Sequence, residues 1–79
     1  MKFETKYKIG QEVYYIKKCM YYDTNPYDIR KDVITNIKIT QSSVQVIIYY
    51  SFNYYSYIQE QMVFATKEEA EQKLREIGE

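Results

Sequence analysis

The sequence predicts a small, mostly β domain: an antiparallel barrel or strongly bent sheet of four to five strands, with one C-terminal helix over about residues 66–77. The 79-residue chain contains ten Ile, five Val and eleven Tyr but a single Leu. Branched and aromatic side chains favour pleated strands, whereas Leu and Ala favour helices. Period-two alternation runs through the middle of the chain, and helical spacing appears at its end.

The length indicates one domain over residues 1–79. A chain of this size buries only about 60–65% of its unfolded surface, so its core is thin. A deep pocket would consume that core. We therefore expect the chain to act through a surface patch.

The first predicted strand covers residues 12–18 and follows a turn at Gly10, where glycine can take a positive φ. Val13 and Tyr15 fall on one face, and Tyr14 and Ile16 fall on the other. The pattern does not decide which face is buried. Residues 19–30 then break the alternation around Pro26 and predict a loop.

A hairpin is predicted next, with strands over residues 33–40 and 44–50 and a turn at Gln41 and Ser42. In the first of these strands the odd positions are expected to face inward; they are Val33, Thr35, Ile37 and Ile39. A further turn is expected near Phe52 and Asn53, where Asn tolerates the left-handed conformation. Strands over residues 54–59 and 62–64 complete the sheet.

The C-terminal helix has the clearest signals. Thr66 and Glu69 have the spacing of a capping box. Ala70, Leu74 and Ile77 form an apolar stripe that should cover the sheet. Glu69–Lys73 and Glu71–Arg75 are predicted i,i+4 pairs, and Gly78 is the predicted stop.

Two segments, KIGQEVYYI near the start and EQMVFATKEEAEQKL near the end, resemble small SH3-like-barrel proteins of phages and prophages of AT-rich Gram-positive bacteria. Richness in Lys, Ile, Tyr and Asn fits such a genome. The resemblance implies an SH3-like or Tudor-like barrel and a mobile-element origin. It transfers no functional residue, because its motifs are structural.

Enzymatic chemistry is not expected. The chain has no His, which removes the usual nucleophile activator and the commonest metal ligand. Its two glycines stand far apart and form no phosphate cradle. We therefore predict no catalytic residue, no metal and no cofactor. Cys19 beside Lys17 and Lys18 is interpreted as a structural residue, with a reactive thiol as the alternative.

Charge and cysteine content limit the cellular location and the class of partner that we expect. The net charge is zero, with an excess of three positive charges in residues 1–40 and three negative charges in residues 41–79. Neutrality disfavours a dedicated nucleic-acid module. A single Cys, and no apolar run long enough for a signal peptide or a membrane span, predict a soluble cytoplasmic protein without a membrane partner.

The tyrosines are the main functional signal, because a barrel this small can bury only about four or five of them. Exposed Tyr suits a protein interface, stacking on nucleic-acid bases, or plain support of the sheet. The leading hypothesis is a non-enzymatic binding protein that docks on a host protein, inhibition of a defence system such as a CRISPR nuclease being one outcome. Its predicted partner-binding residues are Tyr21, Tyr22, Tyr27, Tyr49, Tyr54, Tyr55 and Tyr57.

Two alternatives stay open. One is a small nucleic-acid-binding barrel that uses Lys17, Lys18, Arg30 and Lys31 together with surface tyrosines. The other is a self-associating structural protein, such as a homodimer, whose exposed strand edges pair between copies.

Overall fold

The computed structural model describes residues 4–18 and 27–78. These residues form five strands, a short 3-10 helix and one α-helix. In chain order the elements are β1 (Glu12–Lys18), β2 (Tyr27–Gln41), β3 (Val46–Phe52), β4 (Ile58–Gln59), η1 (Glu60–Met62), β5 (Val63–Phe64) and α1 (Lys67–Gly78). The predicted β fold with a C-terminal helix is confirmed.

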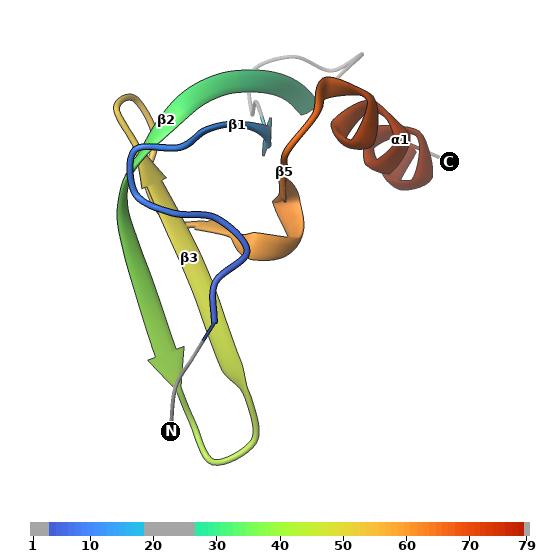
Figure 1. Ribbon diagram of the computed structural model, residues 1–79. Coiled ribbons are helices and arrows are strands. Elements are labelled where there is room, and N and C mark those ends of the chain that lie inside the picture. The colour runs from blue at the N-terminus through green and yellow to red at the C-terminus, as the bar shows by residue number, and fades with distance from the viewer. Residues whose placement is uncertain (1–3, 19–26, 79) are drawn as a thin grey trace.

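The strands form one curled antiparallel sheet in the order β4-β3-β2-β1-β5, which makes a half-barrel (Figure 1). The long strand β2 organises it, because its first half pairs with β1 and its second half pairs with β3. The sheet bends where β2 changes partners. Gly10 precedes β1 with a φ of 92°, and its amide donates to the Ile34 carbonyl at 2.7 Å, so the expected glycine turn is present.

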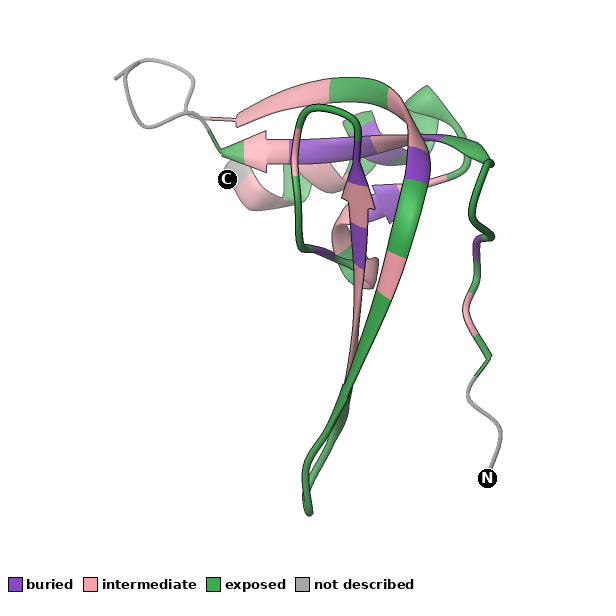
Figure 2. Ribbon diagram, turned by 90° about the vertical axis from the view of Figure 1, so that its left-hand side faces the viewer, coloured by how far each residue is buried: buried purple, intermediate pink, exposed green. Residues whose placement is uncertain are grey.

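The core fills the concave side of this sheet. Val13 and Tyr15 of β1 face it, which settles the orientation of that strand. Ile16 on the opposite face is buried as well, as is Ala70 of α1, and both lie outside the main cluster. Figure 2 shows burial concentrated where the strands meet and exposure along the far end of the hairpin. The core cluster consists of Tyr7, Val13, Tyr15, Ile34, Tyr50, Phe52, Ile58 and Val63.

The predicted inward face of β2 is wrong before residue 36. A β-bulge shifts the register between Ile34, which pairs with Phe52, and Asn36, which pairs with Ser51. Thr35 is the extra residue, and its hydroxyl donates to the Ser51 carbonyl at 3.2 Å. One inserted residue reverses the alternation. Ile34 is therefore buried while Thr35 is exposed. Ile39 is on the same face as Ile37 but is exposed, because it lies farther along the projecting hairpin. Of the four predicted residues, only Ile37 packs against the core.

The hairpin is confirmed with changed bounds. Its turn spans residues 42–45, because the Ser42 amide donates to the Gln45 carbonyl and the Ser42 hydroxyl accepts from the amides of Val44 and Gln45. The predicted strand over residues 54–59 is reduced to the two residues of β4. The left-handed residue in this region is Tyr57, with a φ of 60°, and not Asn53.

The helix α1 begins as predicted, since the Glu69 amide donates to the Thr66 hydroxyl at 3.3 Å. It packs against β1, β2 and β5. Ala70 is fully buried, but Leu74 and Ile77 are only half-buried. Lys73 pairs with Glu76 at 4.0 Å and not with Glu69.

Gly78 is the last residue of the helix. As the α-helix of the described residues, α1 is too short and too polar to cross a membrane.

The predicted loop over residues 19–30 is shorter at its C-terminal end, because Tyr27 to Arg30 pair with β1 as the start of β2. Cys19, Tyr21 and Tyr22 lie outside the described residues.

Candidate binding surface

Three of the predicted partner-binding tyrosines line one shallow hollow of about 430 Å³. Tyr27 comes from the start of β2, while Tyr55 and Tyr57 come from the loop between β3 and β4. The hollow is therefore built by segments far apart in the sequence. Its apolar lining is completed by Ile16, Ile58 and Met62, and its polar lining by Lys18, Ser56, Gln59 and Gln61.

The loop between β3 and β4 is held in place from both sides. The Phe52 amide donates to the Tyr55 carbonyl, and the Asn53 side-chain amide donates to Asp32 Oδ1 at 3.0 Å. Tyr57 adopts a left-handed conformation that is unfavourable for an aromatic residue. Its side chain is nevertheless 57% exposed. Backbone strain that presents an aromatic ring to solvent is characteristic of binding sites.

The rings of this surface contact one another and two lysines. Tyr55 stacks on the buried Tyr15 with ring centroids 6.3 Å apart, and the Lys17 ammonium lies 5.0 Å from the Tyr55 ring centre. Tyr49 meets Tyr57 edge to face at 6.4 Å. The Lys38 ammonium lies 5.0 Å from the Tyr57 ring centre. These contacts limit the freedom of the rings before any partner binds.

Tyr54 belongs to a second hollow of about 410 Å³, whose other lining residues are Tyr15, Lys17, Arg30, Lys31 and Asp32. The Tyr54 ring is 89% exposed, the highest value among the exposed large hydrophobic residues of the described chain. Asp32 Oδ1 accepts from the Val33 amide at 2.7 Å as well as from Asn53. Asp32 Oδ2 is buried and has no partner among the described residues.

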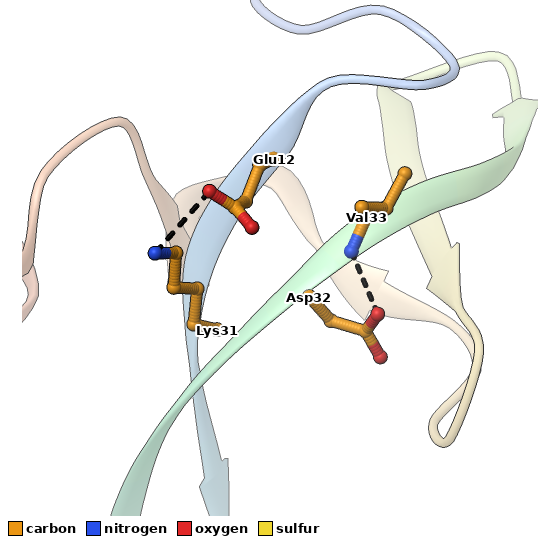
Figure 3. Close-up of polar contacts among 4 residues, drawn as sticks. All are labelled: Glu12, Lys31, Asp32 and Val33. Atoms are coloured by element: carbon orange, nitrogen blue, oxygen red, sulfur yellow. Dashed lines mark hydrogen bonds and ion pairs between the residues drawn. The ribbon is translucent and has the colours of Figure 1, made fainter.

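Two of the four cations predicted for nucleic-acid binding are already paired. Arg30 Nε lies 2.8 Å from Asp28 Oδ2, and Lys31 Nζ lies 3.3 Å from Glu12 Oε1. Figure 3 shows the Lys31–Glu12 pair beside the Asp32–Val33 contact. The hydrogen bond and the charge of Glu12 raise the pKa of Lys31. A cation with a carboxylate partner offers less net charge to a phosphate.

Three tyrosines support the core and are not part of the exposed surface. Of the nine tyrosines in the described residues, Tyr7, Tyr15 and Tyr50 are buried. The Tyr7 hydroxyl donates to the Val63 carbonyl at 3.1 Å, and the Tyr50 hydroxyl donates to Glu60 and accepts from the Tyr7 amide. Burial is the main cause that raises the pKa of each of these phenols.

Sequence reasoning missed several residues of this surface. Lys38 is not among the predicted site residues, although it is the single charged residue in residues 33–59. The apolar lining by Ile16 and Met62 has no sequence signal, because it depends on a strand and a 3-10 helix that meet only in the fold. Residues 4–18 and 27–78 contain no group of three Cys, Asp or Glu residues arranged to hold a metal ion.

No family model, curated protein or solved structure matches this chain.

Proposed function

We propose that this protein is a non-enzymatic binding protein that docks its tyrosine-rich surface on a partner protein. The observation that supports the proposal best is the shared hollow of Tyr27, Tyr55 and Tyr57. Tyr gives large contact area at low entropic cost, and its hydroxyl keeps a hydrogen bond available at the rim. Tyr54 extends the same set of exposed rings into the neighbouring hollow.

The lining of the hollow favours a protein over a nucleic acid as the partner. Ile16, Ile58 and Met62 give the hollow an apolar lining that suits an aliphatic or aromatic side chain. Ile16 and Ile58 are themselves buried, so the tyrosine rings supply the exposed contact area. Nucleic-acid binding needs several uncompensated cations, and Arg30 and Lys31 already have carboxylate partners. Lys17 and Lys38 lie against tyrosine rings and are the feature that keeps base stacking as the second candidate.

The mobile-element origin implied by the resemblance favours a protein of the host cell as the partner. The protein then works in the host cytoplasm, and inhibition of a defence system such as a CRISPR nuclease is the outcome that we propose to test first. Docking by rings on a small rigid sheet suits steric inhibition, because it requires no chemistry from the inhibitor.

The test compares the wild type with Tyr54→Ala and Tyr57→Ala. Each protein is immobilised on a resin and exposed to a lysate of a Gram-positive host. The affinity of each variant for any recovered protein is then measured by calorimetry. We expect one protein at fixed stoichiometry, with binding weakened at least about tenfold in both variants, since exposed tyrosines at an interface centre contribute about 2 kcal/mol or more.

Val44→Ala is the matched control, because Val44 is 85% exposed at the far end of the hairpin and away from both hollows. It should bind like the wild type. The same proteins are titrated with oligothymidine and with oligouridine at physiological salt. Micromolar binding to these strands, lost in the two tyrosine variants, would replace the protein partner by a single-stranded nucleic acid.

A further inference from the structure

The far half of the hairpin projects from the half-barrel as a two-stranded ribbon, with the turn at its tip (Figures 1 and 2). Ile39, Val44 and Val46 are exposed along it. A two-stranded ribbon is marginal in water when nothing covers it. Pairing with a further strand would therefore stabilise this ribbon.

The ribbon is almost without charge. Lys38 is the only charged residue in positions 33–59, although charged residues make up 28% of the chain. β3 itself reads VIIYYSF, with no charge and no Pro. Such a segment pairs readily with another strand unless its edge is blocked. An acidic or basic partner finds nothing complementary here, whereas a neutral, β-branched strand does.

The two edges of the ribbon differ. The β2 edge has three features that oppose pairing: the bulge at Thr35, the charge of Lys38, and the Asn36 side chain. Asn36 Oδ1 accepts from the Ile37 amide at 2.9 Å, so a backbone donor of that edge is already satisfied. Bulges and lysines are the devices by which sheet proteins protect an edge.

The β3 edge has no such device among the described residues. β4 pairs only with Tyr49 and Tyr50, so residues 46–48 have no strand on that side within the described chain. Ser42 bonds to Gln45, and hydrogen-bonded pairs alternate from there along the hairpin. The backbone groups of Val46 and Ile48 therefore point to the open edge. A groove of about 440 Å³ runs beside them, and Gln59, Glu60 and Gln61 line its other side. The Glu60 carboxylate already accepts from the Tyr50 hydroxyl and the Lys6 amide.

The chain is less compact than a typical monomer of its mass. It exposes 6093 Å², whereas a compact monomer of 9.7 kDa exposes about 5,100 Å². The projecting hairpin contributes to this difference. The radius of gyration is also large, at 13.2 Å against about 11.6 Å for 79 residues.

We propose that the β3 edge is a dimer interface, in which residues 46–48 pair antiparallel with the same segment of a second copy. A two-fold axis places β-branched side chains opposite β-branched side chains and brings no like charges together. The product is a continuous four-stranded sheet in the order β2-β3-β3-β2. Residues 46–48 do not line the tyrosine hollow, although Gln59 and Gln61 line both that hollow and the groove beside this edge.

The test uses two proline variants that face each other across the ribbon. Val46 pairs with Gln41, and the alternation turns the amide of each towards its own outer edge. Val46→Pro removes a donor from the β3 edge and Gln41→Pro removes one from the β2 edge, while both spare the ladder between the strands. Sedimentation equilibrium from micromolar to millimolar protein reports the dimer, and far-UV circular dichroism reports the fold.

We expect the wild type to dimerise and Gln41→Pro to dimerise with the same affinity. In Val46→Pro the dimer dissociation constant should rise at least about tenfold. A wild type that stays monomeric at millimolar concentration would overturn the proposal, as would equal effects of the two prolines. Amide exchange of the wild type gives a readout that needs no variant. The Val46 and Ile48 amides must gain protection as concentration rises, and constant protection contradicts the dimer.

Discussion

The Tyr50 hydroxyl is the best-defined buried polar group of this fold, and its removal is a sharp test of the core. Tyr50 is fully buried at the centre of the core cluster. Its hydroxyl donates to the Glu60 carboxylate and accepts from the Tyr7 amide at 3.3 Å. These two hydrogen bonds join the N-terminal segment, β3 and η1. Tyr50→Phe removes these two bonds and keeps the ring, so no cavity forms.

The expected loss of unfolding free energy is about 2–3 kcal/mol. The bond to a charged carboxylate contributes about 1.5–3 kcal/mol, and the neutral bond from Tyr7 contributes about 1 kcal/mol. Two facts reduce their sum. Glu60 keeps a second donor, the Lys6 amide at 3.1 Å, and it is only half-buried, so water can replace the lost hydroxyl. The Tyr7 amide loses its acceptor in a buried contact when the hydroxyl is removed.

Urea unfolding followed by circular dichroism measures this loss, with the slope of the transition checked for two-state behaviour. Tyr54→Phe is the control, because the Tyr54 ring is 89% exposed and its hydroxyl already lies in water. The control should stay within about 0.5 kcal/mol of the wild type. A Tyr50→Phe variant as stable as the control would refute the reasoning, since it would mean that the buried hydroxyl contributes nothing.

Alkaline pH should unfold the protein, because burial raises the pKa of Tyr7, Tyr15 and Tyr50 above the ordinary value of 10.0. The stability that these neutral phenols contribute is fully present below pH 10.0 and is lost as the pH rises towards their folded pKa values. The loss is up to about 1.4 kcal/mol per pH unit for each phenol. Urea midpoints that stay constant up to about pH 11 would contradict this. Leu74→Ala should destabilise the fold by only about 1–2 kcal/mol in the same assay, below the range for fully buried leucines, because Leu74 is half-buried. A loss above about 4 kcal/mol would show that the helix is anchored through Leu74 and not through Ala70.

Elements specified by neighbouring residues could be predicted from the sequence. The helix start at Thr66 depends on one side chain and an amide three residues away. The hairpin depends on period-two alternation on both sides of a turn at Ser42, and Gly10 has the positive φ that its turn requires. Each of these signals is local, and folding preserved it.

Features that require distant segments to meet could not be predicted. The bulge at Thr35 reverses the alternation of β2, because the curled sheet must place both Ile34 and Ile37 against one core. Tyr57 is left-handed in a loop that Asn53 ties to Asp32, a contact between segments far apart in the sequence. No pattern in the sequence distinguishes these positions from their neighbours.

The sequence by itself determined the fold class and the surplus of tyrosines, because composition and alternation report how much apolar surface a chain of this length must place on strands and how much the core cannot hold. Only the tertiary structure decided which tyrosines are buried and which are exposed. Tyr50 is buried and Tyr49 beside it is not, since the pleat turns successive side chains to opposite faces. Tyr27 and Tyr57 share a hollow because β1, β2 and β4 meet there. Three-dimensional packing creates that proximity, and a linear pattern does not encode it.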